Sequence, residues 1–136
     1  MLFPRRAASR GMEIGSFFHV AVKTDDLAAS EAFYRERFGG EVVGRGNADE
    51  GSGATAVNHV ALEVAGKLVY LFDEAPYEAA GLVESVPTGF LHFGYVVPDG
   101  AAADVEFLTE PTAFSDLKIA FLTDTSGVRI ELIEHL

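Results

Sequence analysis

The chain carries the stretch GSFFHVAV at residues 15–22, and GFLHFGYVV at residues 89–97 repeats its pattern. Each is a short apolar run rich in β-forming residues, so each predicts a strand. One histidine lies near the start of each run, His19 in the first and His92 in the second, with no charged residue beside it. Each run is followed by a polar turn, a helical pattern, further strands and a last strand that begins with glycine. The chain therefore reads as two copies of one structural unit.

The last strands of the two units are GKLVYLF at residues 66–72 and GVRIELI at residues 127–133. Aligned on their glycines, they place Tyr70 opposite Glu131. His19, His92 and Glu131 then occupy corresponding strand positions in the two units. Two histidines and a carboxylate on facing strands are ligands that suit a divalent transition metal. We therefore interpret these three residues as metal ligands.

The first unit, module one, spans about residues 16–74 and reads as βαβββ. Thr24, Asp25 and Asp26 offer oxygens that cap a helix, and the glycine pair at residues 39–40 ends it. The predicted elements, in order, are a strand at 17–22, a helix at 27–38, a strand at 41–44, a polar loop at 46–53, and a hairpin of strands at 58–64 and 67–72.

A connector of residues 75–88 joins module one to module two, which spans about residues 89–135. Module two repeats the order of elements in a shorter form. The pair Glu134 and His135 is interpreted as a fraying, solvated end. The predicted elements of module two are a strand at 90–97, a turn at 98–100, a helix at 101–108, a weak strand at 112–114, and a hairpin of strands at 118–122 and 128–133.

Composition favours one packed domain. The chain has 136 residues, of which 49% are hydrophobic, whereas halves of roughly 60 residues would be marginal alone. We expect a single domain over residues 13–136. Residues 1–12 are basic but lack the apolar segment of a signal peptide. We interpret them as a disordered tail, or as an extension ahead of a natural start at Met12.

Charge and cysteine content exclude several classes of partner. The net charge of −11 argues against nucleic acid and anionic membrane surfaces, because both attract Lys and Arg. The chain has no cysteine, so disulfides and thiolate metal sites are excluded. No apolar stretch approaches the roughly 20 residues of a membrane-spanning helix, and we expect a cytoplasmic protein. The acidic balance fits either a salt-loving host or an ordinary acidic cytosolic protein.

Strand alternation predicts the surroundings of the three ligands. His19 is expected to share a face with Phe17 and Ala21, and His92 with Gly94. Small neighbours leave room for a ligand, and apolar walls strengthen interactions with a metal by excluding water. Glu131 lies between two aliphatic residues, so the alternative for this side chain is a solvated position on the outer face of the sheet.

The stretch DTSGVRIEL at residues 124–132 resembles the closing strand of the vicinal oxygen chelate superfamily, which includes glyoxalase, bleomycin-resistance and extradiol-dioxygenase proteins. FHVAV at residues 18–22 is similar to the first strand of that family, and His92 falls where the family places its second histidine. The resemblance implies an α+β fold in which two βαβββ modules form a curved eight-stranded mixed sheet around a metal-binding cleft. It also implies a homodimer and a divalent metal (Fe, Mn, Ni, Co or Zn) held by His19, His92 and Glu131.

Position 70 departs from part of that family. In members that resemble glyoxalase I or methylmalonyl-CoA epimerase, this position supplies a fourth ligand, Glu or Gln. Tyr70 is a poor ligand because its phenol has an ordinary pKa of about 10, which argues against proton transfer between two bases across one metal. The Tyr-x-x-Asp-Pro signature of extradiol-cleaving members is also absent. Arg129 is the only cation predicted on the cleft face. The alternative for this side chain is a salt bridge to a neighbouring acid.

Two functions fit this set of residues best, and a small substrate-sensing protein is a third possibility. The first is a metal-dependent lyase, isomerase or dioxygenase that binds two oxygens of a small substrate and stabilises the enolate or alkoxide that forms. Glu131 would act there with Tyr70 or His59 as proton donor, although His59 also fits a hydrogen-bonded sheet position. The second is a metal-free protein that sequesters a small aromatic or antibiotic-like molecule in the same cleft. Retention of all three ligand types favours the enzyme.

Overall fold

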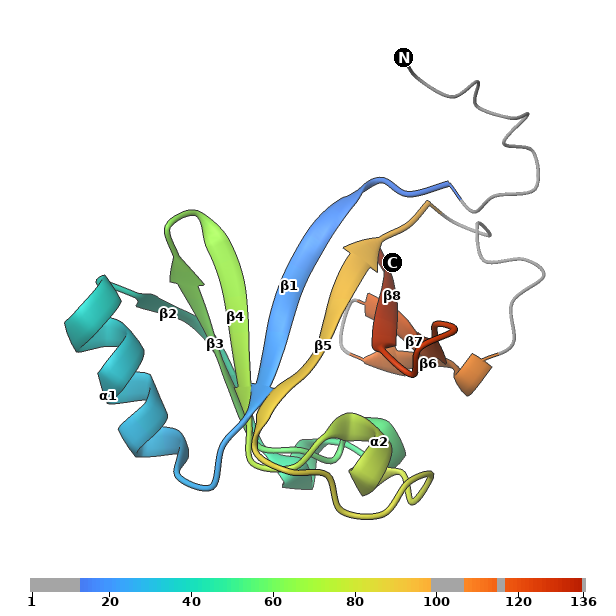
Figure 1. Ribbon diagram of the computed structural model, residues 1–136, viewed down its shortest axis with the longest axis horizontal. Coiled ribbons are helices and arrows are strands. Elements are labelled where there is room, and N and C mark those ends of the chain that lie inside the picture. The colour runs from blue at the N-terminus through green and yellow to red at the C-terminus, as the bar shows by residue number, and fades with distance from the viewer. Residues whose placement is uncertain (1–12, 99–106, 115–116, 136) are drawn as a thin grey trace.

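The computed structural model describes residues 13–98, 107–114 and 117–135. These residues form one eight-stranded sheet in the order β2-β3-β4-β1-β5-β8-β7-β6, and Figure 1 shows how strongly it curves. The neighbours β1–β4 and β5–β8 run parallel and all other neighbours run antiparallel, so the predicted mixed sheet is confirmed. The strands are β1 (Ser16–Lys23), β2 (Glu41–Gly46), β3 (His59–Val64), β4 (Lys67–Phe72), β5 (Gly89–Val96), β6 (Phe107–Phe114), β7 (Leu117–Thr123) and β8 (Arg129–His135).

The register of the central strands confirms the internal repeat. In the antiparallel pair β1–β5, His19 lies opposite Gly94 and Ala21 opposite His92. In the parallel pairs, Ala21 lies beside Tyr70 on β4, and Gly94 beside Glu131 on β8. The two halves are therefore related residue by residue, and Tyr70 occupies in module one the place of Glu131 in module two.

Helix α1 (Leu27–Phe38) covers one face of the first half of the sheet (Figure 1). Asp26 caps its start by accepting a hydrogen bond from the Ala29 backbone N–H, and Gly39 ends it in the left-handed conformation at φ 67°. The helix packs Leu27 and Tyr34 against a cluster of sheet residues that includes Leu62. A second cluster, centred on Tyr77 and Phe121, fills the opposite, concave face.

A β-bulge precedes each histidine and overturns one prediction. Phe18 is an extra residue in the β1–β5 ladder, because Phe17 lies opposite Tyr95 whereas His19 lies opposite Gly94. The bulge turns Phe17 to the outer face, where it is 46% exposed and stacks on Phe93 with ring centroids 6.1 Å apart. The expectation that Phe17 shares a face with His19 is therefore wrong, because a bulge interrupts strand alternation.

The equivalent bulge in β5 lies at Leu91. Ala21 pairs with His92 whereas Val22 pairs with Phe90, so Leu91 is the extra residue. Leu91 is buried in the concave-face cluster, whereas Phe90 is 58% exposed. Phe18 and Leu91 thus occupy matching positions in the two modules, and each lies directly before a histidine.

Module two differs from its predicted elements at both ends. Residues 101–106 of the predicted helix lie outside the described part of the chain. Its last two residues, Phe107 and Leu108, belong to strand β6. The predicted tail at residues 1–12 also lies outside the described part. The strand β6 contains Pro111, which an edge strand tolerates because no further strand needs its missing N–H. Glu134 and His135 pair with β7 and extend β8, so they are not a frayed end.

The connector contains a short helix, α2 (Pro76–Ala79), that was not predicted. The Glu78 carboxylate accepts hydrogen bonds from the backbone N–H groups of Ala75 and Val86 at 2.7 and 2.8 Å, and from Lys23 Nζ of β1 at 2.9 Å. These bonds tie α2 to the central strand. Two short 3-10 helices, at Ala48–Glu50 and Gly53–Thr55, lie between β2 and β3. Within the described residues, no helix is long and apolar enough to cross a membrane.

Candidate metal centre

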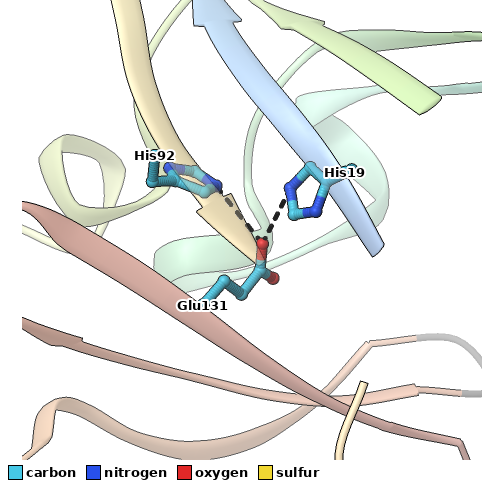
Figure 2. A group of neighbouring side chains, drawn as sticks. All are labelled: His19, His92 and Glu131. Carbon is cyan, nitrogen blue, oxygen red and sulfur yellow. Dashed lines mark ion pairs between the residues drawn. The ribbon is translucent and has the colours of Figure 1, made fainter. Parts of the chain in front are cut away.

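Three buried side chains from three strands meet at one point on the concave face. His19 comes from β1, His92 from β5 and Glu131 from β8, and both imidazoles point at one oxygen of the carboxylate (Figure 2). Glu131 Oε1 lies 3.1 Å from His19 Nε2 and 3.2 Å from His92 Nε2. One ligand atom from each residue lies within 4.8 Å of the other two. The solvated alternative for Glu131 is wrong, because its exposure is only 8%.

Gly94 makes room for the His19 ring. A Cβ at position 94 would lie 2.7 Å from His19 Cε1 and 2.9 Å from His19 Nδ1, closer than real contacts allow. The backbone of β5 therefore runs directly past the imidazole. Glycine at this position is a requirement of the site, and its counterpart in module one is Ala21, which is fully buried.

His92 is held by a residue from the connector. The Tyr77 hydroxyl lies 3.2 Å from His92 Nδ1 and donates a hydrogen bond to the Leu91 carbonyl at 3.1 Å. The guanidinium of Arg129 lies over the Tyr77 ring, 4.5 Å from its centroid. Arg129 thus makes a cation–π contact with Tyr77. The alternative given above for Arg129, a salt bridge to a neighbouring acid, is a different interaction from this one.

Electrostatics keep Glu131 and His92 in forms that attract a cation. Burial alone would raise the pKa of Glu131, but the His19 and His92 side chains beside its carboxylate outweigh burial and lower that pKa to about 2. Burial lowers the pKa of His92, so its imidazole is neutral at pH 7. A neutral imidazole beside an ionised carboxylate is the combination of protonation states that metal binding requires.

The donor set fits a divalent transition metal. Cis ligands about 2.1 Å from one octahedral ion lie about 3.0 Å apart, close to the two separations found here. His19 Nδ1 and His92 Nε2 are buried and have no hydrogen-bond partner of good geometry in the described part of the protein. Buried polar atoms normally have partners, and an ion between these groups would satisfy His92 Nε2.

A small, mostly apolar cavity of about 40 Å³ adjoins His19 and Glu131. Tyr70 and His59 both line it, and their rings stack with centroids 5.8 Å apart and an interplanar angle of 15°. Burial lowers the pKa of His59, which leaves this imidazole neutral at pH 7. No Lys or Arg of the described chain lines the cavity. Its apolar wall includes Phe18, Val57, Phe72, Leu117, Ile119 and Ile133.

The structure therefore brings His19, His92 and Glu131 together, and it places Tyr70 and His59 beside them on one cavity. Tyr77 was missed, because its segment was interpreted only as a connector. A signal was available in the sequence: Pro76 at the first helical position and Glu78 two residues later are typical of a helix start. No pattern in the sequence indicated that this helix would reach His92.

The fold and the site identify the class of protein. The chain matches the family model of the Glyoxalase/Bleomycin resistance protein/Dioxygenase superfamily over residues 16–132. The chain belongs to this superfamily, which confirms the resemblance seen in the sequence. No curated protein sequence matches the chain.

Solved structures share the fold. Methylmalonyl-CoA epimerase from Mycobacterium tuberculosis matches with a TM-score of 0.72 at 19% identity, over 100% of this chain and 93% of its own. A variant of methylmalonyl-CoA epimerase from Streptomyces coelicolor, in complex with 2-nitronate-propionyl-CoA, matches with a TM-score of 0.68 at 25% identity, over 90% and 99% of the two chains. A hypothetical protein from Bacillus halodurans C-125 matches with a TM-score of 0.66 at 18% identity, over 88% and 94%.

Proposed function

We propose that this protein is a metal-dependent enzyme of the superfamily, and that His19, His92 and Glu131 hold a divalent ion. The observation that carries the proposal is the approach of two buried imidazole nitrogens, at 3.1 and 3.2 Å, to one oxygen of a buried carboxylate. Three protein ligands on one side of an ion leave positions for a substrate with two neighbouring oxygens. Bound there, the ion would supply Lewis acidity that stabilises negative charge on those oxygens.

The neighbouring side chains suit proton transfer. His59 is neutral at pH 7 because burial lowers its pKa, so it is able to accept a proton from a substrate carbon or hydroxyl. Tyr70 lines the same cavity and carries a hydroxyl that is able to donate one. We assign these two residues the acid–base role and place the reaction among the isomerases and lyases of the superfamily. The absence of the extradiol signature supports this choice over a dioxygenase.

The cavity favours a small substrate of low charge. Aromatic and aliphatic side chains form most of its wall, and no Lys or Arg among its described lining would pair with a phosphate or carboxylate. The epimerase structure from Streptomyces coelicolor contains a coenzyme A derivative, whose phosphates need such partners. We therefore propose a small oxygenated substrate with an apolar body in place of a coenzyme A thioester.

Metal analysis tests this proposal. Protein purified without added metal should contain near-stoichiometric Fe, Mn, Ni, Co or Zn, and His92→Ala should lose it. The rival function, sequestration of a small aromatic molecule without metal, is favoured by the apolar cavity wall. Wild-type protein that stays empty after soaking in each metal, yet binds aromatic compounds, would support the rival and exclude the enzyme.

A further inference from the structure

Tyr77 contacts a candidate metal ligand, His92, from the connector between the modules. Its side chain is fully buried, and its hydroxyl contacts two atoms of consecutive residues on β5. It donates to the carbonyl oxygen of Leu91 at 3.1 Å and lies 3.2 Å from Nδ1 of His92. Leu91 is the bulged residue, so the bulge brings its carbonyl and the neighbouring imidazole to the same hydroxyl.

The single proton of the Tyr77 hydroxyl determines which nitrogen of the His92 imidazole carries a hydrogen. A tyrosine hydroxyl has one proton to donate, and of its two partners the Leu91 carbonyl is the one that can only accept, so we assign the proton to that bond. The same hydroxyl is then only an acceptor toward His92, so Nδ1 of His92 carries a hydrogen and donates it. A neutral imidazole has one N–H group, and Nε2 of His92 therefore presents its lone pair.

That lone pair faces a carboxylate. Nε2 of His92 lies 3.2 Å from Oε1 of Glu131 and forms no hydrogen bond of good geometry with any described residue. Two electron-rich atoms at this distance repel each other unless a cation lies between them. The position of Tyr77 thus leaves the imidazole in the form that binds a metal through Nε2.

The hydroxyl is held in place from several sides. Arg129 lies over one face of the Tyr77 ring, and Phe121 contacts the ring edge-on with centroids 5.3 Å apart. The helix that carries Tyr77 is tied to β1 through Glu78 and Lys23. Because ring and helix are both constrained, the hydroxyl has little freedom to leave His92.

We propose that Tyr77 is a positioning residue that keeps His92 in its Nδ1–H tautomer and so prepares Nε2 as a metal ligand. The inference rests on the proposed function, because the prepared nitrogen matters only if a metal binds. Without the Tyr77 hydroxyl, Nε2 would take the proton and donate it to Glu131, and an incoming metal would have to displace that proton.

The first test measures the tautomer in metal-free protein. Nitrogen-15 NMR of the imidazoles distinguishes Nδ1–H from Nε2–H directly. We expect the Nδ1–H form of His92 in wild type and a shift toward Nε2–H in Tyr77→Phe, which keeps the ring and removes only the hydroxyl. Tyr95 contacts Phe17 and Phe93 edge-on on the outer face of β5, so Tyr95→Phe should leave the His92 signal unchanged.

The second test measures Co²⁺ affinity by chelator competition. Tyr77→Phe should bind Co²⁺ at least tenfold more weakly than wild type, as loss of a hydrogen bond to a ligating histidine typically does, whereas Tyr95→Phe should not. An unchanged His92 tautomer or an unchanged Co²⁺ affinity in Tyr77→Phe would overturn the inference. If wild type binds no metal at all, the proposed function fails separately, and the tautomer in the two variants still decides whether Tyr77 sets the state of His92.

Discussion

Gly94 shows how one residue without a side chain determines whether the site exists. The His19 ring occupies the space that any Cβ at position 94 would need. Phe18 and Tyr70 contact the His19 ring, with centroids 5.0 and 4.9 Å away, and restrict where it could move. A displaced ring would take Nε2 away from Glu131.

Gly94→Ala should therefore weaken Co²⁺ binding at least tenfold and cost about 1–3 kcal/mol of folding free energy through overpacking. Chelator competition and urea unfolding measure the two effects. Gly44→Ala is the matched control, since its Cβ would lie 3.8 Å from the nearest atom, an ordinary contact with Ala61. Wild-type Co²⁺ affinity in Gly94→Ala would show that His19 does not need its present position.

Glu131→Gln should weaken Co²⁺ binding at least tenfold, or about 1.4 kcal/mol, because it removes the negative charge and keeps the shape. The measurement is the same competition assay. Glu134→Gln, on the same strand but paired with Lys118 toward the sheet edge, should bind as wild type does. Equal affinity in Glu131→Gln and wild type would remove this carboxylate from the site.

The metal-free protein should lose stability as the pH falls from about 7.5 to about 5.5. Burial lowers the pKa of both His59 and His92 below 6.5 in the fold, so the unfolded chain binds protons in this range that the folded chain does not. Stability therefore falls with pH, by at most about 1.4 kcal/mol per pH unit for each group. Glu131, with its pKa lowered from 4.5 to about 2, adds a further loss only below pH 4.5.

Urea unfolding of metal-free protein across this pH range measures the effect. His59→Phe should reduce the slope, whereas replacement of the exposed His135 by Gln should preserve it. An unfolding free energy that stays flat across the range would contradict the neutral state of both histidines in the folded protein.

At the scale of elements, the two bulges explain why part of the site escaped prediction. The repeat of histidine strands and glycine-led closing strands was sufficient to predict the eight strands and to align Tyr70 with Glu131. Strand alternation was not sufficient to place Phe17 and Phe18, because one extra residue in a ladder reverses which neighbour faces inward. A bulge depends on how a strand pairs with its neighbour, so the sequence of β1 alone does not predict it.

The connector illustrates the same limit. Helix α2 is four residues long, and its position beside the site depends on hydrogen bonds to other parts of the chain. Glu78 joins α2 to Lys23 of β1 and to the backbone of Val86, partners that are 55 and 8 residues away. Such long-range pairing has no periodic signature in the sequence, which is why Tyr77 was not among the predicted site residues.

Glu78→Ala should destabilise the protein by about 1–3 kcal/mol, because it leaves two backbone N–H groups without their acceptor and the partly buried Lys23 ammonium with only the Val86 carbonyl. It should also weaken Co²⁺ binding, since α2 carries Tyr77. Urea unfolding and metal competition measure the two effects. Glu84→Ala, at an exposed position of the same connector, is the control and should change neither. A Glu78→Ala variant as stable as wild type would show that these bonds do not anchor α2.

At the scale of the whole molecule, duplication brings the first and last strands of both modules to the centre of the sheet. The modules have not kept equal roles: one supplies a histidine and a tyrosine, the other a histidine and a glutamate. The net charge of −11 repels anions, in keeping with a substrate of low charge. The homodimer implied by the family resemblance stays a prediction that light scattering would test.

The central claim is that His19, His92 and Glu131 converge on one metal ion. Anomalous diffraction from crystals grown with Co²⁺ and recorded at the cobalt edge tests this claim most directly. We predict one dominant anomalous peak, bonded to Nε2 of both histidines and to the Glu131 carboxylate at about 2.0–2.2 Å. Crystals of the same protein with no peak between these three side chains, or with the ion bound elsewhere, would contradict the account.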